Sequence, residues 1–185
     1  TNTKVIATPL EAVLELDVVD GKNGFIIPFE YFDEYLDYYK SLKDKGNHII
    51  TTKIEHPSVF NVFQKLETLG FDVIYLDVDE SGMIDLEQLK QSINKDTILV
   101  SIMWVNNVIG VIEPIEEVIK IVKEYPRCKL HVDAVQGMGK IKPNFKFQDL
   151  DLITISSHKL EGLKGTGLLV YNEKINITNH IAGAG

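Results

Sequence analysis

The sequence predicts an α/β protein in which a doubly wound, mainly parallel sheet is covered by helices on both faces, giving three layers. From residue 47 onward, short apolar segments alternate with longer amphipathic segments, as strands and helices do in parallel sheets. Residues 97–103 and 152–155 form nearly continuous apolar runs, which are typical of strands buried on both faces. We therefore expect one core domain built on such a sheet.

Residues 1–46 form an atypical N-terminal segment. Val13, Leu14 and Leu16 suggest a short helix or strand, and residues 20–24 have the composition of a turn. Aromatic residues at helical spacing begin at Phe29, so we expect an amphipathic helix that runs to about Lys45.

Residues 47–171 form the expected core, and residues 172–185 a C-terminal extension without a small domain. Ser58 is a candidate N-cap, Gly70 closes a helix, and Pro114 stands in the first turn of another. The expected helices are residues 58–69, 85–93 and 114–124. The expected strands are residues 48–52, 72–76, 97–103, 130–132, 152–156 and 168–171.

Composition excludes several classes of protein. The formal net charge of −8 disfavours a nucleic-acid-binding surface, which normally needs a basic patch. No apolar run is long enough to span a membrane. The single cysteine, Cys128, excludes an internal disulfide framework and fits a reducing compartment. We expect a cytoplasmic protein that binds neither nucleic acid nor membranes.

Polar residues that can do chemistry follow four of the predicted strands. They are Glu55 and His56, Asn106 and Asn107, Asp133 and Gln136, and the run Ser156–Lys159. In a parallel sheet these positions meet at one edge, where ligands bind. Each alone is explained as a turn or cap residue, but four such strand ends together indicate a site.

Lys159 is the residue around which this site is organised. It directly follows an apolar strand and is followed by Gly162, Gly165 and Gly167, which let the backbone approach a ligand closely. A lysine held there can be desolvated and can form a Schiff base, although a solvated lysine in a turn is the simpler interpretation.

These residue types suit pyridoxal phosphate. A lysine amine bonds the cofactor covalently, and a carboxylate keeps the pyridine nitrogen protonated so that the ring accepts electrons. An imidazole can stack on the ring, an amide can donate to its phenolate oxygen, and serine and histidine can bind the phosphate.

Four segments resemble the cysteine desulfurases, which have the class V aminotransferase fold and supply sulfur for iron–sulfur clusters. The segments are Ile49–His56, Val105–Asn107, His131–Gln136 and Ser156–Lys159, the last followed by Gly162–Gly165. The resemblance implies a fold-type I large domain that binds pyridoxal phosphate, and it extends over residues 47–171.

The resemblance also implies a role for each candidate. Lys159 matches the Schiff-base lysine and His56 the stacking residue that handles protons, so these two are the catalytic candidates. The cofactor-binding candidates are Asp133 at the pyridine nitrogen, Gln136 at the phenolate oxygen, Asn107 against the ring, and Ser156 and His158 at the phosphate.

Three features depart from the family pattern. Val108 stands where the family has a glutamate, and residues 25–30 lack the Gly-Ala-Thr-Glu phosphate-binding turn. The sulfur-accepting cysteine of the family lies beyond the lysine, whereas Cys128 precedes it and is interpreted as a structural thiol.

The expected function is desulfuration of cysteine to alanine, with sulfur passed to an acceptor protein by a homodimeric enzyme for which this chain alone is incomplete. The alternative is a non-catalytic relic or scaffold that keeps the fold. The glycine spacing fits neither a dinucleotide nor a P-loop site. A metal site at His131 and Asp133 lacks a clear third ligand, so no metal is expected.

Overall fold

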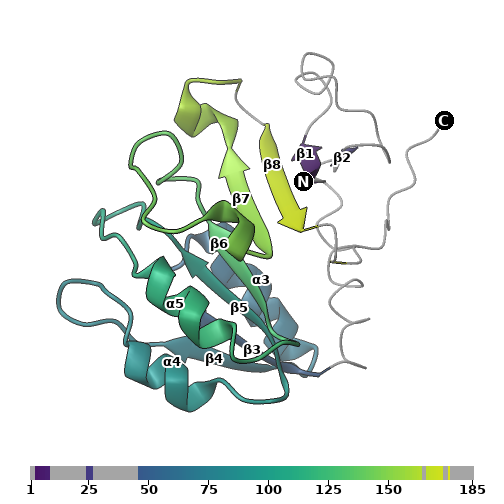
Figure 1. The fold of residues 1–185 in the computed structure, drawn as a ribbon, viewed down its shortest axis with the longest axis vertical. Helices are drawn as coiled ribbons and strands as arrows, with labels where there is room; N and C mark the ends of the chain where they lie inside the picture. Colours follow the sequence, from purple (N-terminus) through teal and green to yellow (C-terminus); the bar gives the residue numbers. More distant parts are fainter. Residues whose placement is uncertain (1–2, 9–23, 27–45, 164–165, 173–174, 176–185) are drawn as a thin grey trace.

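The described strands of the computed structural model form one eight-stranded sheet (Figure 1). The structure describes residues 3–8, 24–26, 46–163, 166–172 and 175. The strands are β1 (Thr3–Thr8), β2 (Gly24–Ile26), β3 (His48–Thr52), β4 (Asp72–Leu76), β5 (Thr97–Met103), β6 (Lys129–Asp133), β7 (Leu152–Ser156) and β8 (Gly167–Asn172).

The strand order is β2-β1-β8-β7-β6-β5-β3-β4. Strands β3 to β7 pair in parallel, whereas β8 runs antiparallel to both β7 and β1. Three α-helices are described, α3 (Pro57–Thr68), α4 (Leu86–Ser92) and α5 (Ile115–Val122), with two short 3₁₀ helices, η3 (Phe147–Asp149) and η4 (Ser157–Leu160). The predicted mainly parallel α/β sheet with flanking helices is confirmed.

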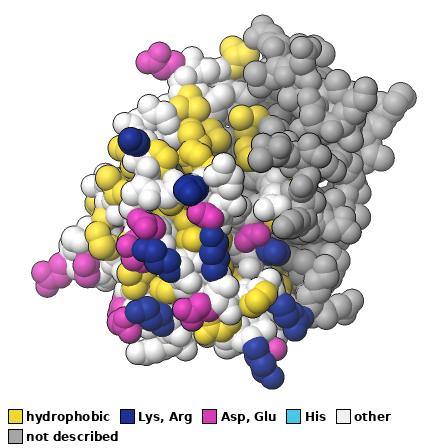
Figure 2. Space-filling model, viewed as in Figure 1, with side chains coloured by type: hydrophobic (Ala, Val, Ile, Leu, Met, Phe, Trp, Pro, Cys, Tyr) yellow, Lys and Arg dark blue, Asp and Glu magenta, His cyan; other side chains and the backbone are white. Residues whose placement is uncertain are grey.

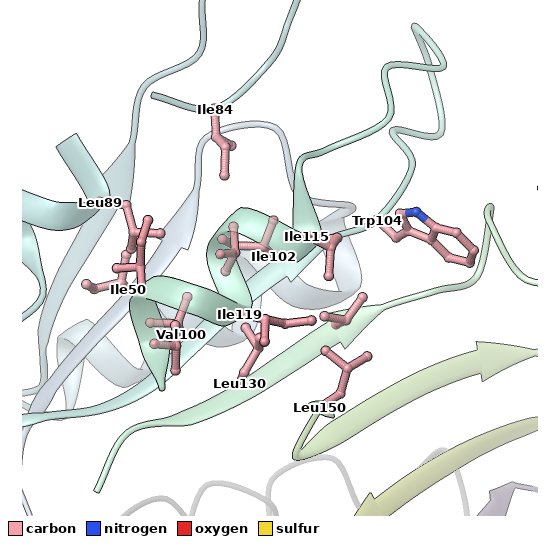
Figure 3. Packing of buried hydrophobic residues seen from close by; sticks show 14 of the residues in the cluster. Ile50, Ile84, Leu89, Val100, Ile102, Trp104, Ile115, Ile119, Leu130 and Leu150 are labelled. Carbon is pink, nitrogen blue, oxygen red and sulfur yellow. The ribbon is translucent and has the colours of Figure 1, made fainter. Parts of the chain in front are cut away.

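Helices α4 and α5 cover one face of the sheet through the larger core cluster. Successive side chains of a strand point to opposite faces, so Ile50, Val100 and Leu130 lie on this face together. Figure 3 shows them facing Ile115 and Ile119 of α5. Burying an apolar side chain of this size contributes about 1.5–3 kcal/mol, which makes this cluster a main source of stability.

Helix α3 covers the opposite face near β3 and β5. Its Phe63 and Leu66 pack with Ile49 and Leu99, which belong to the second core cluster. In Figure 1, α3 lies behind the sheet and α4 and α5 lie in front of it. The two clusters together give the predicted three layers.

Local differences from the sequence prediction have local causes. Helix α3 begins one residue earlier than predicted, because Pro57 takes the first helical position and His56, rather than Ser58, is the N-cap. Strands β1 and β2 were not predicted, and β2 begins at Gly24 within the predicted turn. The predicted helix over residues 29–45 and the expected element at residues 13–16 lie outside the described residues.

Surface charges of both signs are interspersed over the face that carries α4 and α5 (Figure 2). Lys120 Nζ lies 3.1 Å from Glu116 Oε1, and Lys123 Nζ lies 2.5 Å from Asp149 Oδ1. Such exposed pairs contribute about 0–1 kcal/mol each, so they add little to the core packing. Within the described part of the chain, no helix is long and apolar enough to cross a membrane.

Gly137 is required by its contact with a buried tryptophan. A Cβ at this position would lie 2.3 Å from Cε3 of Trp104, which is only 1% exposed. Gly137→Ala should therefore destabilise the fold by about 1–3 kcal/mol in urea unfolding, as overpacking does. Trp104→Phe replaces the indole with a smaller ring. The destabilisation caused by Gly137→Ala should therefore be smaller in the variant that carries both substitutions. Additive effects of the two substitutions would contradict the contact.

Candidate active site

The four strand ends singled out from the sequence are neighbours in the sheet. Strands β7, β6, β5 and β3 are adjacent and parallel, so their carboxyl ends lie along one edge. Asp133 is the last residue of β6, and Ser156 is the last residue of β7. The sequence argument that placed the candidates on a common edge is therefore supported by the strand pairing.

Asp133 is held rigidly at the centre of this edge. Its carbonyl accepts a hydrogen bond from Trp104 N at 2.9 Å, and Ala134 N donates to Thr154 O at 2.9 Å, so pairing continues past the strand on both sides. The carboxyl is buried, and its Oδ1 accepts from Val135 N at 2.9 Å. Burial raises the pKa of Asp133, against the opposing effects of the Val135 N–H and the charge of His56.

His56 lies at the start of α3, where its ring has one nitrogen occupied. Nδ1 accepts from Ser58 N at 3.2 Å and lies 2.8 Å from Ser58 Oγ. Because Nδ1 accepts, the neutral ring carries its proton on Nε2. The charge of His56 favours the ionised form of Asp133. Both residues lie at the edge formed by the carboxyl ends of the parallel strands, His56 after β3 and Asp133 at the end of β6.

Gln136 and Asn107 differ in burial and in hydrogen bonding. Gln136 is half-buried, and its Oε1 accepts from Lys140 Nζ at 2.9 Å, which leaves the amide nitrogen as its donor. Asn107 is exposed, whereas its neighbour Asn106 is buried. Asn106 Nδ2 donates to Ile54 O at 3.0 Å. Asn106 thus joins the loop after β5 to the loop after β3, a role that the sequence analysis missed.

Lys159 lies in η4, directly after β7, and its side chain is exposed. The loop around it is fastened by Ser157, whose Oγ donates to Leu163 O at 2.5 Å and bonds the hydroxyl of Thr166. Glu161 adopts a left-handed conformation with φ 62°, which ends η4. The roles of Ser157 and Thr166 were not predicted from the sequence, although two hydroxyl residues bracketing a glycine-rich loop were the available signal.

The two phosphate-ligand candidates contact each other. Ser156 Oγ lies 2.6 Å from His158 Nδ1, with Ser156 half-buried and His158 exposed. Both groups lie at the carboxyl end of β7, beside Lys159. The bond between them uses one of the two donors of a hydroxyl and a neutral imidazole, so the pair has one donor left for an anion.

His131 lies on the same face of β6 as Asp133, two residues earlier. Its Nδ1 lies 2.7 Å from Ser101 Oγ, and its Nε2 lies 3.2 Å from Thr154 Oγ1, so it joins three strands. Burial lowers the pKa of His131 to about 4, and the ring is neutral. Among the described residues, no three His, Cys, Asp or Glu side chains are grouped as a metal site requires.

Cys128 lies at the other end of β6 from Asp133. It directly precedes the strand, is 4% exposed, and its pKa is raised by burial to about 12. A thiol in such surroundings is a poor nucleophile. Its burial agrees with the structural role expected from the sequence.

Comparisons with known proteins agree on the relationship of this chain. Residues 36–182 match the family described as aminotransferase class-V. The chain is 44% identical over 141 residues to a putative cysteine desulfurase IscS of Bacillus subtilis, and 47% identical over 143 residues to a cysteine desulfurase IscS of Clostridium botulinum. These alignments cover 76% and 77% of the chain but only 37% and 36% of the relatives.

Solved structures show the same similarity. A structure titled "NIFS-LIKE PROTEIN" superposes with a TM-score of 0.75 at 38% identity, covering 80% of this chain and 41% of that one. A second, titled "SspA in complex with cysteine", gives a TM-score of 0.72 at 34% identity, covering 82% and 45%. The two cysteine desulfurases named above are longer than this chain, which spans a little over a third of their length.

The burial of Cys128 predicts an unreactive thiol. At neutral pH its thiolate fraction should be about 1,000-fold below that of an exposed cysteine, so the native protein should be labelled slowly by a thiol reagent. Labelling of the Cys128 peptide, followed by mass spectrometry, should become fast in urea. Rapid labelling of the folded protein would contradict the assigned burial.

Proposed function

We propose, because the chain belongs to the aminotransferase class-V family, that the protein containing it is a pyridoxal-phosphate-dependent cysteine desulfurase. The observation that carries the proposal is the set of groups at the carboxyl ends of β3, β6 and β7. An imidazole, a buried carboxyl and a lysine amine at this one edge of the sheet occur in a chain similar to named desulfurases.

The chemistry of this donor set fits the cofactor. Asp133 is a carboxyl fixed by backbone hydrogen bonds on both sides, which suits a group that must hold a proton at a ring nitrogen. Gln136 has its amide oxygen directed to Lys140, which leaves the amide nitrogen as the donor toward a ligand. The residues present therefore support cofactor binding.

When bound, pyridoxal phosphate supplies an electron sink for bond breaking at the amino-acid substrate. Lys159 Nζ is the proposed point of covalent attachment, and Ser156 and His158 bind the phosphate. Asp133 keeps the pyridine nitrogen protonated. His56 stacks on the ring and moves protons through Nε2, since Nδ1 is occupied by Ser58.

The proposed substrate is cysteine, which is converted to alanine while its sulfur passes to a cysteine thiolate of the enzyme and then to an acceptor protein. Cys128 is not that thiolate, because it is buried at the opposite end of β6. Asn107 is proposed to lie against the ring and the substrate carboxylate. We also infer that the protein is a cytoplasmic homodimer. The IscS names of the relatives suggest that it supplies sulfur for iron–sulfur clusters.

Lys159→Ala should abolish covalent attachment of the cofactor. The visible absorption of the bound cofactor should disappear, and borohydride should no longer fix it to the protein, while circular dichroism stays unchanged. Lys142→Ala, an exposed lysine elsewhere on the chain, is the matched control and should retain both signals. Cofactor fixed by borohydride to another lysine in the Lys159→Ala protein would refute the assignment.

Asp133→Asn should lower turnover with cysteine by about 10- to 100-fold, because a charge-assisted hydrogen bond is worth about 1.5–3 kcal/mol. The amide can still accept from Val135 N, so the fold should persist. Asp85→Asn is the control, since asparagine caps α4 as well as aspartate does. Unchanged turnover in Asp133→Asn would assign the role at the ring nitrogen to another group.

A further inference from the structure

Glu55 is a buried carboxyl that the mechanism above does not use. It directly precedes His56 and is 6% exposed. Its Oε1 accepts from Thr52 Oγ1 at 2.8 Å and from Met103 N at 2.9 Å, so a single oxygen joins the end of β3 to the end of β5. Its Oε2 is buried without a hydrogen-bond partner among the described residues.

A second contact joins the same two segments. Asn106 Nδ2 donates to Ile54 O at 3.0 Å, one residue before Glu55. The connection between β3 and α3 is therefore tied to the end of β5 by two side chains. One is Glu55, from the connection itself, and the other is Asn106, from the loop after β5. His56 is the last residue of this connection, and its position depends on both contacts.

The charged groups that act on Glu55 are acidic. Met103, which donates to Glu55, pairs in register with Asp133, and the charges of Asp133 and Glu113 both oppose ionisation of Glu55. Burial is the largest cause, and together these effects raise the pKa of Glu55 to about 8. Burial also raises the pKa of Asp133, but there the Val135 N–H and the charge of His56 favour the ionised form.

We propose that Glu55 is a positioning residue, which as a neutral acid holds the β3–α3 connection and His56 at the strand ends and leaves Asp133 as the charged carboxyl of the pair. Oε1 accepts both donors, and Oε2 carries the proton. An ionised Glu55 would be repelled by the charges of Asp133 and Glu113, so the proton on Glu55 lowers the negative charge at the site. The assignment to catalysis rests on the proposed function, whereas the position and charge of Glu55 do not.

Glu55→Gln and Glu55→Ala separate this role from others. Glutamine keeps the Oε1 acceptor and stays neutral, whereas alanine leaves Met103 N buried without its partner. Glu55→Ala should weaken binding of pyridoxal phosphate and lower kcat by about tenfold or more, and Glu55→Gln should restore both to near the wild-type values. Glu67→Gln, an exposed glutamate on α3, is the matched control.

Two readouts test the proposal without the cofactor. The NMR signals of the His56 ring should shift in Glu55→Ala and not in Glu55→Gln. An unfolded glutamate ionises near pH 4.5, whereas folded Glu55 keeps its proton to about pH 8. The urea midpoint of the wild type should therefore fall relative to Glu55→Gln as pH rises from 5 to 8, and the difference should level off above pH 8. Asp133 and Glu113 are present in both proteins, so their direct titrations largely cancel.

Three results would overturn the proposal. A Glu55→Gln protein as inactive as Glu55→Ala, with unshifted His56 signals, would indicate proton transfer by Glu55. Unshifted His56 signals in Glu55→Ala would remove the positioning role, and a pH-independent difference in urea midpoint would show that folded Glu55 is charged. Failure of the wild type to bind pyridoxal phosphate would instead refute the proposed function. The His56 NMR signals and the pH dependence of the urea midpoint would still decide the role of Glu55, because neither measurement needs the cofactor.

Discussion

The parallel pairing of β3, β5, β6 and β7 is the constraint on which the rest of the structure depends. Each strand runs in the same direction as its neighbour, so the residues that follow each strand arrive at the same edge. The hydrogen bonds from Trp104 N to Asp133 O and from Ala134 N to Thr154 O extend this pairing beyond the strands. Asp133 is consequently fixed by backbone pairing on both sides, and its carboxyl accepts a further hydrogen bond from Val135 N.

Burial of carboxyl groups sets the electrostatics of this edge. Asp133, Glu55 and Glu113 are all buried, and desolvation raises the pKa of each. Glu113 Oε2 accepts from Ile84 N at 3.0 Å, which joins the turn before α4 to the segment before α5. A stability-optimised core would contain fewer such groups, because buried charges are costly. Their concentration beside the strand ends is the arrangement expected of a functional site.

The departure of Val108 from the family pattern has a simple structural account. Val108 N donates to Asn106 Oδ1 at 2.9 Å, while the Val108 side chain is 82% exposed. The loop is therefore held by the backbone of residue 108 and by Asn106, so packing places little restriction on the side chain at this position.

The sequence by itself determined the elements whose signals are local. Apolar runs gave the bounds of β3, β5 and β7 as the structure has them, and the residues after these strands included the proposed catalytic residues Lys159 and His56. The pattern of motifs also indicated the family. Only the tertiary structure decided that β1 and β2 join the sheet beside β8, and that Glu55 and Asn106 bind the β3 and β5 loops together. These features depend on contacts between segments far apart in the chain, which side-chain periodicity does not encode.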